Sequence, residues 1–334
     1  MDPEKANGGS PMARVNVENL RPGTDVTETF LVREANLRTA RNGKSYISCT
    51  LADATGTVPA VLWDATADVF GAFKSGAYVK VRGRVELYRD AAQIVIAQSR
   101  PVTASDVDAA DFLPATRADV KALLAELDAC VARVREEPLR ALLEDFFGDA
   151  EFREKFAAAP AAMRNHHAYL GGLLEHTVSV ARLAESLIAQ RPELDADLLR
   201  AGVLLHDAGK VEELAAGAAL HYTDAGYLLG HVALGALMVE RRAARVKGFP
   251  GRTRLLLLHL LLSHHGRREF GSPVLPATAE ALALHHLDNL DAKVNAAAHF
   301  SENAPGDREN WTEYISMFEG RLYTGGREGA NAKT

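Results

Sequence analysis

The chain has 334 residues, of which 47% are apolar, 25% charged and 7% aromatic, and its formal net charge is −6. This composition excludes wholesale disorder, collagen and a coiled coil. At about 100–200 residues per domain, the length predicts two domains. The longest apolar run, 255–262, is broken by a histidine and is too short to span a bilayer, so we expect no membrane association. Two widely separated cysteines form no metal-type pair, which favours a reducing, cytoplasmic location.

Charge and histidine are distributed unevenly along the chain. Residues 13–102 hold 12 Lys/Arg and 9 Asp/Glu, a net charge of +3, whereas the remaining residues carry −9. A local basic face can attract nucleic acid even in an acidic protein. All 12 histidines lie between His166 and His299. This confinement indicates that metal or proton chemistry belongs to the second half of the chain.

The first part of the chain predicts β structure. Residues 1–12 are polar and rich in Gly and Pro, so we expect a disordered tail. From about 26 onward, alternating hydrophobicity and turn residues predict five strands, at 26–33, 46–51, 58–63, 78–88 and 93–102. A short helix, 66–73, is expected between the third and fourth strands. This is the element order of an OB-fold, a small partly open barrel, which we assign to 13–103.

Two strands of this barrel predict a nucleic-acid surface. In the fourth, Val79, Val81, Val85 and Leu87 are expected to face inward, and Gly83 on the same side predicts a bulge. In the second, inward Ile47, Cys49 and Leu51 leave a tyrosine outward. Cations with an interleaved aromatic suit single-stranded nucleic acid, the alternative being a solvated strand face. The candidate binding residues are Arg41, Lys44, Tyr46, Lys80, Arg82 and Arg84. We expect Phe30, Trp63 and Phe70 in the barrel core.

From Asp106 onward the pattern is helical, and no further strand is expected. An amphipathic segment after Pro114 and two short helices, 138–147 and 149–158, predict a helical linker over 104–162. Larger helices are expected at 172–190, 195–206, 225–245, 252–264 and 277–300. They predict a second, all-α domain over 163–320, followed by a flexible tail over 321–334.

Histidines and carboxylates recur on separate predicted helices. The series is His176, His206, Asp207, His231, His264, His265 and Asp288, with Asp291 close behind. Adjacent helical side chains point about 100° apart. His206 and Asp207 can therefore hold one ion only at a helix end or kink, or else Asp207 bridges two ions and His206 binds one. Imidazole and carboxylate ligands favour Mn, Fe, Co, Ni or Zn, and the lack of thiolates disfavours a structural zinc site.

These residues carry a family resemblance. The pattern H…HD…D, with a lysine three positions after Asp207, resembles the HD-domain superfamily of metal-dependent phosphohydrolases. More narrowly, the chain is similar to the YhaM-type 3′→5′ exoribonucleases, which place an OB-fold before the HD domain. This resemblance covers about 13–320 and rests on segments 166–177, 204–214, 227–232, 263–276 and 285–293. The Gly-Tyr-Pro signature of the cyclic-di-GMP branch is missing after His265.

The resemblance implies a site with two divalent transition ions, Mn²⁺ being favoured. It assigns His176, His206, Asp207 and Asp288 to one ion, while Asp207 bridges to a second held by His231 and by His264, His265 or both. Asp291 is then expected to orient a ligand. Lys210 is the expected phosphate clamp. His166 and His167 are candidates for contacting the terminal phosphate or acting as an acid, the alternative being a capping or packing role.

The implied reaction is hydrolysis of single-stranded RNA from its 3′ end to nucleoside 5′-monophosphates, with single-stranded DNA left open as a substrate. A homo-oligomer is compatible with the sequence. One alternative is an HD-type nucleotide phosphohydrolase or cyclic-nucleotide phosphodiesterase that uses the OB-fold for assembly. A second is a non-catalytic nucleic-acid-binding protein, and a third is an oxygenase with a di-iron HD site.

Overall fold

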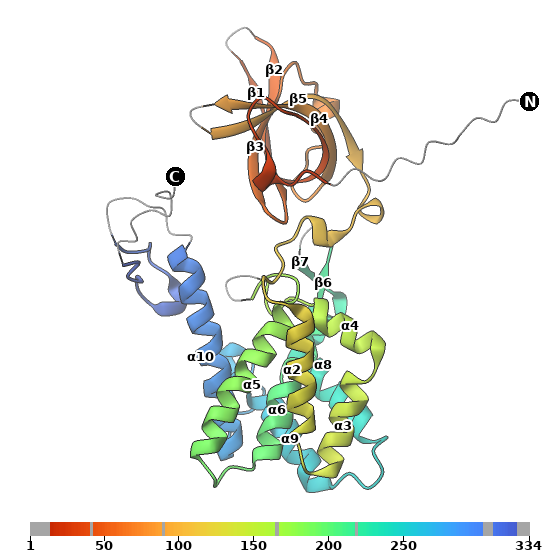
Figure 1. The fold of residues 1–334 in the computed structure, drawn as a ribbon, viewed down its shortest axis with the longest axis vertical. Coiled ribbons are helices and arrows are strands. Elements are labelled where there is room, and N and C mark those ends of the chain that lie inside the picture. Colours follow the sequence, from red (N-terminus) through yellow and green to blue (C-terminus); the bar gives the residue numbers. More distant parts are fainter. Residues whose placement is uncertain are drawn as a thin grey trace, which may run out of the picture. The chain divides into compact units, whose positions relative to one another are not determined.

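The structure, a computed structural model, describes residues 14–40, 43–88, 91–163, 167–217, 220–302 and 310–325. The chain divides between Pro114 and Ala115 into two compact units, the first mainly β and the second mainly helical (Figure 1). This confirms the predicted fold class. Arg41 and His166 lie outside the described residues, as do the predicted tail over 1–12 and most of the one over 321–334.

Five strands of the first unit form a closed barrel in the order β1-β2-β3-β5-β4, and the ring closes because β1 also pairs with β4 (Figure 1). The strands are β1 (Asp25–Thr39), β2 (Ser45–Asp53), β3 (Gly56–Leu62), β4 (Tyr78–Tyr88) and β5 (Ala91–Val102). β3 pairs with β5 in parallel, and a short helix, α1 (Ala67–Phe70), lies between β3 and β4 in the chain. This is the predicted OB-fold.

Strand β1 is longer than the sequence predicts. It was expected to end at Arg33 but continues to Thr39, with a register shift between Val32 and Glu34. Its first half pairs with β4 and its second half with β2, so the bend at the shift lets one strand join both neighbours. The second half is mostly exposed and carries no apolar alternation, which is why the sequence pattern missed it.

The barrel core corrects two expectations. Phe30 is fully buried as predicted, and Phe70 is partly buried against the core. Trp63, however, is 54% exposed, because it follows the last residue of β3 instead of continuing that strand. Leu87 is 62% exposed near the end of the β4–β5 hairpin. The other predicted inward residues of β2 and β4 are buried: Ile47, Cys49, Leu51, Val79, Val81 and Val85.

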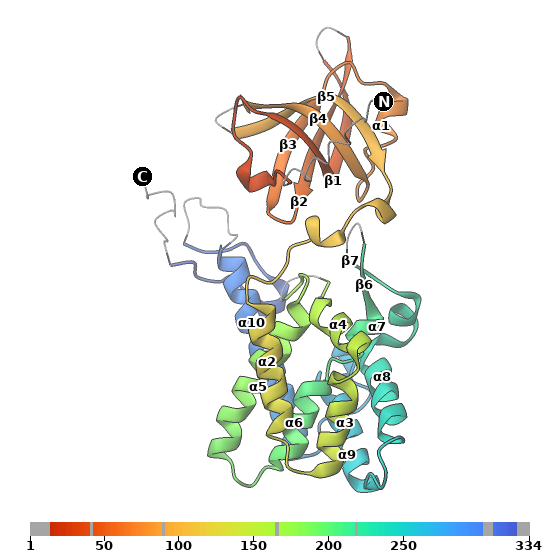
Figure 2. The same cartoon turned by 45° about the vertical axis from the view of Figure 1, so that its right-hand side comes forward.

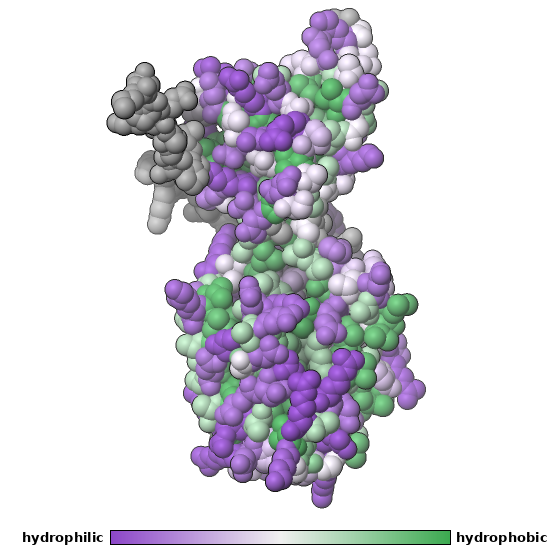
Figure 3. Space-filling model, turned by 90° about the vertical axis from the view of Figure 1, so that its right-hand side faces the viewer, coloured by the Kyte–Doolittle hydropathy of each residue, from purple (hydrophilic) through white to green (hydrophobic). Residues whose placement is uncertain are grey.

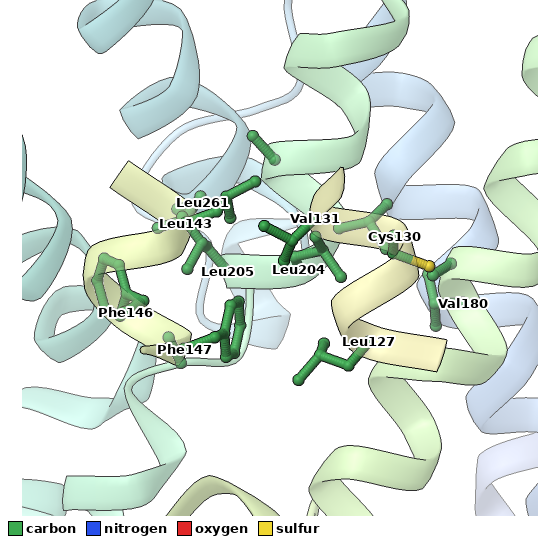
Figure 4. Close-up of a cluster of buried hydrophobic side chains, with 14 of the residues drawn as sticks. Leu127, Cys130, Val131, Leu143, Phe146, Phe147, Val180, Leu204, Leu205 and Leu261 are labelled. Carbon is green, nitrogen blue, oxygen red and sulfur yellow. The ribbon is translucent and has the colours of Figure 1, made fainter. Parts of the chain in front are cut away.

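The helices of the second unit pack around one apolar core. They are α2 (Val120–Ala132), α3 (Glu137–Phe147), α4 (Ala150–Ala158), α5 (Gly172–Gln190), α6 (Ala196–Leu205), α7 (Lys210–Glu213), α8 (Asp224–Ala243), α9 (Gly251–Ser263) and α10 (Ala279–Glu302). All of these except α7 contribute side chains to one cluster of buried apolar residues. Figure 4 shows side chains of α2 and α3, such as Leu127 and Phe147, meeting Val180 of α5 and Leu204 of α6. The short helices before α5 therefore belong to the same core as the larger ones.

The expectation of no further strand is wrong, because two short strands, β6 (Leu214–Ala216) and β7 (Leu220–Tyr222), pair as a hairpin after α7 (Figure 2). Three residues are too few to show a period of two, so the pattern could not reveal them.

On the face drawn in Figure 3, hydrophilic residues predominate and hydrophobic ones are exposed between them. Within the described residues, no helix is long and apolar enough to cross a membrane.

Gly83 lies at the predicted bulge, and we expect any side chain there to destabilise the barrel. The register between β4 and β5 shifts between Arg82 and Gly83, and an added Cβ would lie 2.4 Å from the carbonyl oxygen of Val95. Gly83→Ala should lower the free energy of unfolding of the barrel by about 1–3 kcal/mol in denaturant titration. Gly251→Ala, where an added Cβ meets nothing within 4 Å, is the matched control. Equal stability of the two variants would contradict this explanation.

Candidate functional site

Seven side chains from five parts of the helical unit converge on one centre. They are His176 on α5, His206 and Asp207 directly after α6, His231 on α8, His264 and His265 directly after α9, and Asp288 on α10. Because α6 ends at Leu205, His206 and Asp207 lie in the turn that follows it. This is the helix-end position that two adjacent ligands require. Helix α8 is interrupted at Gly230, whose φ of 71° and ψ of 156° let the chain change direction just before His231.

One group of donor atoms lies between α5, α6 and α10. The Nε2 atom of His176 is 3.1 Å from Oδ1 of Asp288 and 3.3 Å from Nε2 of His206. Nε2 of His206 is in turn 3.3 Å from Oδ2 of Asp207. These distances suit four ligand atoms that surround a single cation.

A second group lies between α8 and the end of α9. Nε2 of His231 is 3.2 Å from Nε2 of His265 and 3.5 Å from Oδ1 of Asp207. The same Asp207 oxygen is 3.7 Å from Nε2 of His264, so both residues of the His264–His265 pair reach this group. Asp207 thus presents Oδ2 to the first group and Oδ1 to the second.

Hydrogen bonds at Nδ1 fix the orientation of all five imidazoles. His176 donates to Asp291 (2.7 Å) and His231 to Glu213 (2.9 Å). The other three donate to backbone carbonyls: His206 to Val203, His264 to Leu261 and His265 to Phe270. With Nδ1 as donor, each neutral ring carries its lone pair on Nε2, the atom that faces the centre.

The donor set fits divalent metal ions. Oδ1 of Asp207 and Nε2 of His264 are buried and have no hydrogen-bond partner among the described residues, although they face each other. Burial and the neighbouring His265 hold the pKa of His264 well below its usual value, which leaves the ring neutral. A bound cation would be the missing partner of both the carboxylate oxygen and the imidazole lone pair. This mixture of N and O donors suits first-row transition metals.

His176 shows the competition between protons and metal. Burial lowers its pKa, but hydrogen bonds to the carboxylates of Asp288 and Asp291 outweigh burial and raise the pKa to about 9. Burial likewise opposes ionisation of Asp288, yet the hydrogen bond from His176 and the proximity of His206 hold its pKa below the usual value. A bound cation would replace the proton between them.

Asp291 and His167 lie beside the ligands. Oδ2 of Asp291 accepts from His176 and, at 3.1 Å, from Nε2 of His167, while Ser179 donates to Oδ1. His167 is 3% exposed, and its Nδ1 lies 2.9 Å from the hydroxyl of Tyr169. Since both of its ring nitrogens already have protein partners, the geometry favours the packing alternative for His167 over contact with substrate.

Lys210 borders the bridging carboxylate. Its Nζ is 2.6 Å from Oδ2 of Asp207, and the side chain is largely buried. Burial opposes ionisation of Asp207, but the neighbouring Lys210 and His206 hold its pKa well below the usual range. An ammonium group can donate three hydrogen bonds, so the Asp207 contact does not exhaust the capacity of Lys210.

Sequence reasoning missed Glu213. It lies at the end of α7, and its Oε1 accepts from both the backbone N–H and Nδ1 of His231. Glu213 precedes His231 by 18 positions with a hairpin between them, so no helical spacing could have linked the two. Ser179 offered a weak signal, because it follows His176 by three residues on one helix face.

The candidate nucleic-acid residues of the barrel lie on separate strands. Lys80, Arg82 and Arg84 face outward on β4, and Arg84 lies 3.7 Å from Asp25. Tyr46 on β2 is half-buried and contacts Trp63, with ring centroids 4.9 Å apart. β1 pairs with both β2 and β4 and so lies between them.

Lys44 lies just before β2, 3.0 Å from Asp64. Arg38 on β1 is directly opposite Tyr46. The outward cations and the aromatic pair therefore belong to two stretches of surface that the exposed residues of β1 connect.

Family models match both units of the chain. Residues 31–102 match an OB-fold nucleic acid binding domain, and residues 173–293 match the HD domain. Among solved structures, the second OB-fold domain of replication protein A from Methanococcus maripaludis is 22% identical, covers 27% of this chain and 95% of that chain, and has a TM-score of 0.23.

Curated relatives match across both domains. The 3′-5′ exoribonuclease YhaM of Shouchella clausii is 35% identical and covers 92% of this chain and 95% of its own. The protein of the same name from Bacillus subtilis is 34% identical, covering 90% of this chain and 95% of its own. The one from Geobacillus sp. is 36% identical, with 90% and 92% covered. The chain therefore belongs to the YhaM family of 3′-5′ exoribonucleases.

Proposed function

We propose that this chain is a metal-dependent 3′→5′ exoribonuclease that hydrolyses single-stranded RNA to nucleoside 5′-monophosphates at a two-ion centre. The observation that carries the proposal is the pair of donor groups joined by Asp207, one oxygen of which faces each group. The 3′→5′ polarity and the RNA substrate follow from the activity named for the relatives. Single-stranded DNA remains the alternative substrate to be tested beside RNA.

We assign the ligands by their distances. His176, His206, Asp207 and Asp288 would hold one ion, and Asp207, His231, His264 and His265 the other. Mn²⁺ is the proposed metal because the family resemblance favours it, and imidazole and carboxylate ligands without thiolates are compatible with Mn, Fe, Co, Ni or Zn. When bound, such ions supply a hydroxide-like nucleophile and neutralise charge on the phosphoryl oxygens.

The surrounding residues have defined tasks in this proposal. Asp291 and Glu213 hold the rings of His176 and His231 so that Nε2 faces the centre. Lys210, anchored beside Asp207, donates a hydrogen bond to a phosphoryl oxygen and offsets the negative charge that develops on it. The barrel binds the single strand through its outward cations and through stacking on Tyr46 and Trp63.

Metal content tests the ligand assignment. Asp207→Ala should lose bound Mn²⁺ while the protein stays folded, because both donor groups lose their shared carboxylate. Glu213→Gln should weaken the affinity for Mn²⁺ by about 10–100-fold, since His231 loses the carboxylate that orients it. Glu212→Gln, on the exposed side of the same helix, is the matched control. Elemental analysis and calorimetric Mn²⁺ titration measure the effects, and unchanged metal binding in Asp207→Ala would refute the site.

The polarity of degradation tests the reaction. A 5′-labelled single-stranded RNA should shorten as a ladder from its 3′ end in the presence of Mn²⁺, because each cycle removes one terminal nucleotide. A blocked 3′ terminus should slow the reaction, and chelation should stop it until Mn²⁺ is restored. Gel electrophoresis over time distinguishes the outcomes. Early appearance of internal fragments would contradict exonucleolytic action, and parallel assays with single-stranded DNA give the substrate preference.

Salt dependence tests the role of the barrel. Replacing Lys80, Arg82 and Arg84 by alanine should weaken RNA binding and flatten the slope of log K against log salt by up to about two units, since each phosphate contact contributes about 0.7. Tyr46→Ala and Trp63→Ala should each weaken binding by about 1–3 kcal/mol without changing the slope.

Lys121→Ala, an exposed cation on α2, is the control for the triple variant. Fluorescence anisotropy at several salt concentrations gives the slopes. Hydrolysis of bis(p-nitrophenyl) phosphate, which needs no long strand, should persist in the barrel variants. Wild-type RNA binding by the triple variant would mean that the barrel serves assembly instead.

A further inference from the structure

We propose that four apolar residues beside the metal centre form a stacking platform for the terminal nucleobases of the substrate strand. The stacking platform comprises Tyr222 at the end of β7 and Tyr227, Leu228 and Leu229 on α8. This inference rests on the proposed function and identifies where that site would hold the base, in addition to the phosphate. None of the four is a metal ligand in the assignment above.

The exposure of these residues is unusual for a helix. Tyr227 is 76% exposed, Leu228 81% and Leu229 53%, and they follow one another directly in the chain. Three consecutive helical residues cover about 200° of the circumference, so they cannot all belong to one core-facing stripe. A run of exposed apolar residues promotes association and is typical of a surface that binds a ligand or partner.

The break in α8 explains how these side chains stay outside the core. The helix begins after Thr223, and buried Gly226 seats its first turns against Glu213, where an added Cβ would lie 2.3 Å from the backbone oxygen. At Gly230 the helical dihedrals are interrupted, and only after this point do buried residues recur, at Val232, Leu234 and Val239. The same break therefore aims His231 at the centre and leaves the three preceding side chains exposed.

The aromatic members of the platform contact each other, and Gly226, which precedes Tyr227, packs against Glu213, the carboxylate that accepts from His231. The rings of Tyr222 and Tyr227 have centroids 5.0 Å apart. Leu229 is separated from His231 only by Gly230. Phe270, itself 62% exposed, accepts through its carbonyl the hydrogen bond from Nδ1 of His265. Exposed apolar side chains thus flank both His231 and His265, whose Nε2 atoms are 3.2 Å apart.

A nucleobase is the occupant that this position favours. A strand whose terminal phosphodiester lies at the donor groups must place its adjacent bases near them, and three members of the platform lie on the same helix as the ligand His231. Flat aromatic and leucine surfaces accept any base face, whereas base-specific recognition requires fixed hydrogen-bond donors and acceptors. Stacking there also suits an enzyme that removes successive nucleotides of any sequence.

Stacking can be observed directly with a 3′-terminal 2-aminopurine, whose fluorescence falls when its ring stacks. The probe is a single-stranded oligoribonucleotide, mixed rapidly with the Mn²⁺-loaded full-length protein and recorded before cleavage. Wild-type protein should quench the fluorescence, Tyr227→Ala should largely abolish the quenching, and Tyr227→Phe should preserve it. Quenching that is the same in wild type and in Tyr227→Ala would overturn the proposal. Quenching requires bound RNA but no turnover. A failure of the stacking proposal can therefore be distinguished from a failure of the proposed nuclease activity.

Steady-state kinetics provide the second arm. Tyr227→Ala should raise the KM for the oligoribonucleotide by about 5- to 150-fold, the range that loss of one base stack produces. An abasic 3′-terminal nucleotide should raise the KM of wild type similarly and that of Tyr227→Ala little further, since both changes remove the same contact. Leu228→Ala should also raise the KM for the oligoribonucleotide. Leu255→Ala, 68% exposed near the start of α9 and nine residues from His264, is the matched control and should leave KM unchanged.

A second copy of this chain is the competing occupant. If Tyr227→Ala changes the sedimentation coefficient of the protein while the KM and the quenching stay at their wild-type values, the exposed residues form an interface between copies and the proposal is wrong. An unchanged sedimentation coefficient with altered KM and quenching supports the platform.

Discussion

The buried carboxylate of Asp207 is the constraint on which the helical unit depends. Its side chain is 2% exposed, and an ionised carboxylate in that environment is costly unless charged or polar partners surround it. Imidazoles face both of its oxygens, and the ammonium of Lys210 contacts one of them. Two of the imidazoles, those of His231 on α8 and His264 after α9, come from parts of the chain far from Asp207 in the sequence. The helices must therefore assemble correctly before the charge is compensated, and this requirement links the stability of the core to the integrity of the site.

The two pairs of adjacent ligands both lie directly after the end of a helix, and the same local structure orients the histidine that begins each pair. His206 and His264 each follow the last residue of a helix, and each donates from Nδ1 to a carbonyl three residues earlier, that of Val203 or Leu261. The last carbonyls of a helix lack partners within the helix, so the imidazole satisfies one of them and is oriented in return. The following residue, Asp207 or His265, is then free of helical geometry and can turn toward the same centre. Two adjacent ligands become usable because the helix stops where they begin.

The sequence predicts the barrel, the helical unit and the residues that converge. Strand alternation and an ordered series of histidines can be recognised in the sequence without any knowledge of tertiary contacts. It does not predict Glu213, whose link to His231 passes through a hairpin of two three-residue strands too short to show a period. Trp63 was misassigned to the core because the alternation of β3 was extended one residue past the end of the strand. The sequence likewise does not predict that residues 227–229 are exposed, since a helical pattern gives no sign of the interruption at Gly230.

The charge distribution explains why the two units would hold a strand by different forces. Residues 115–334, which form the helical unit, hold 25 Lys/Arg and 30 Asp/Glu, a net charge of −5, so away from Lys210 and any bound metal ions the field of this unit would repel phosphates. An apolar surface of tyrosine and leucine gains affinity from the bases, which carry no net charge, and this contribution is insensitive to screening. The barrel, whose residues 13–102 carry a net +3, would gain affinity from phosphates and lose it as salt rises. Strand capture would then depend on ionic strength while placement of the terminal nucleotide would not, so a rise in salt slows the binding of new strands more than it disturbs the geometry at the centre.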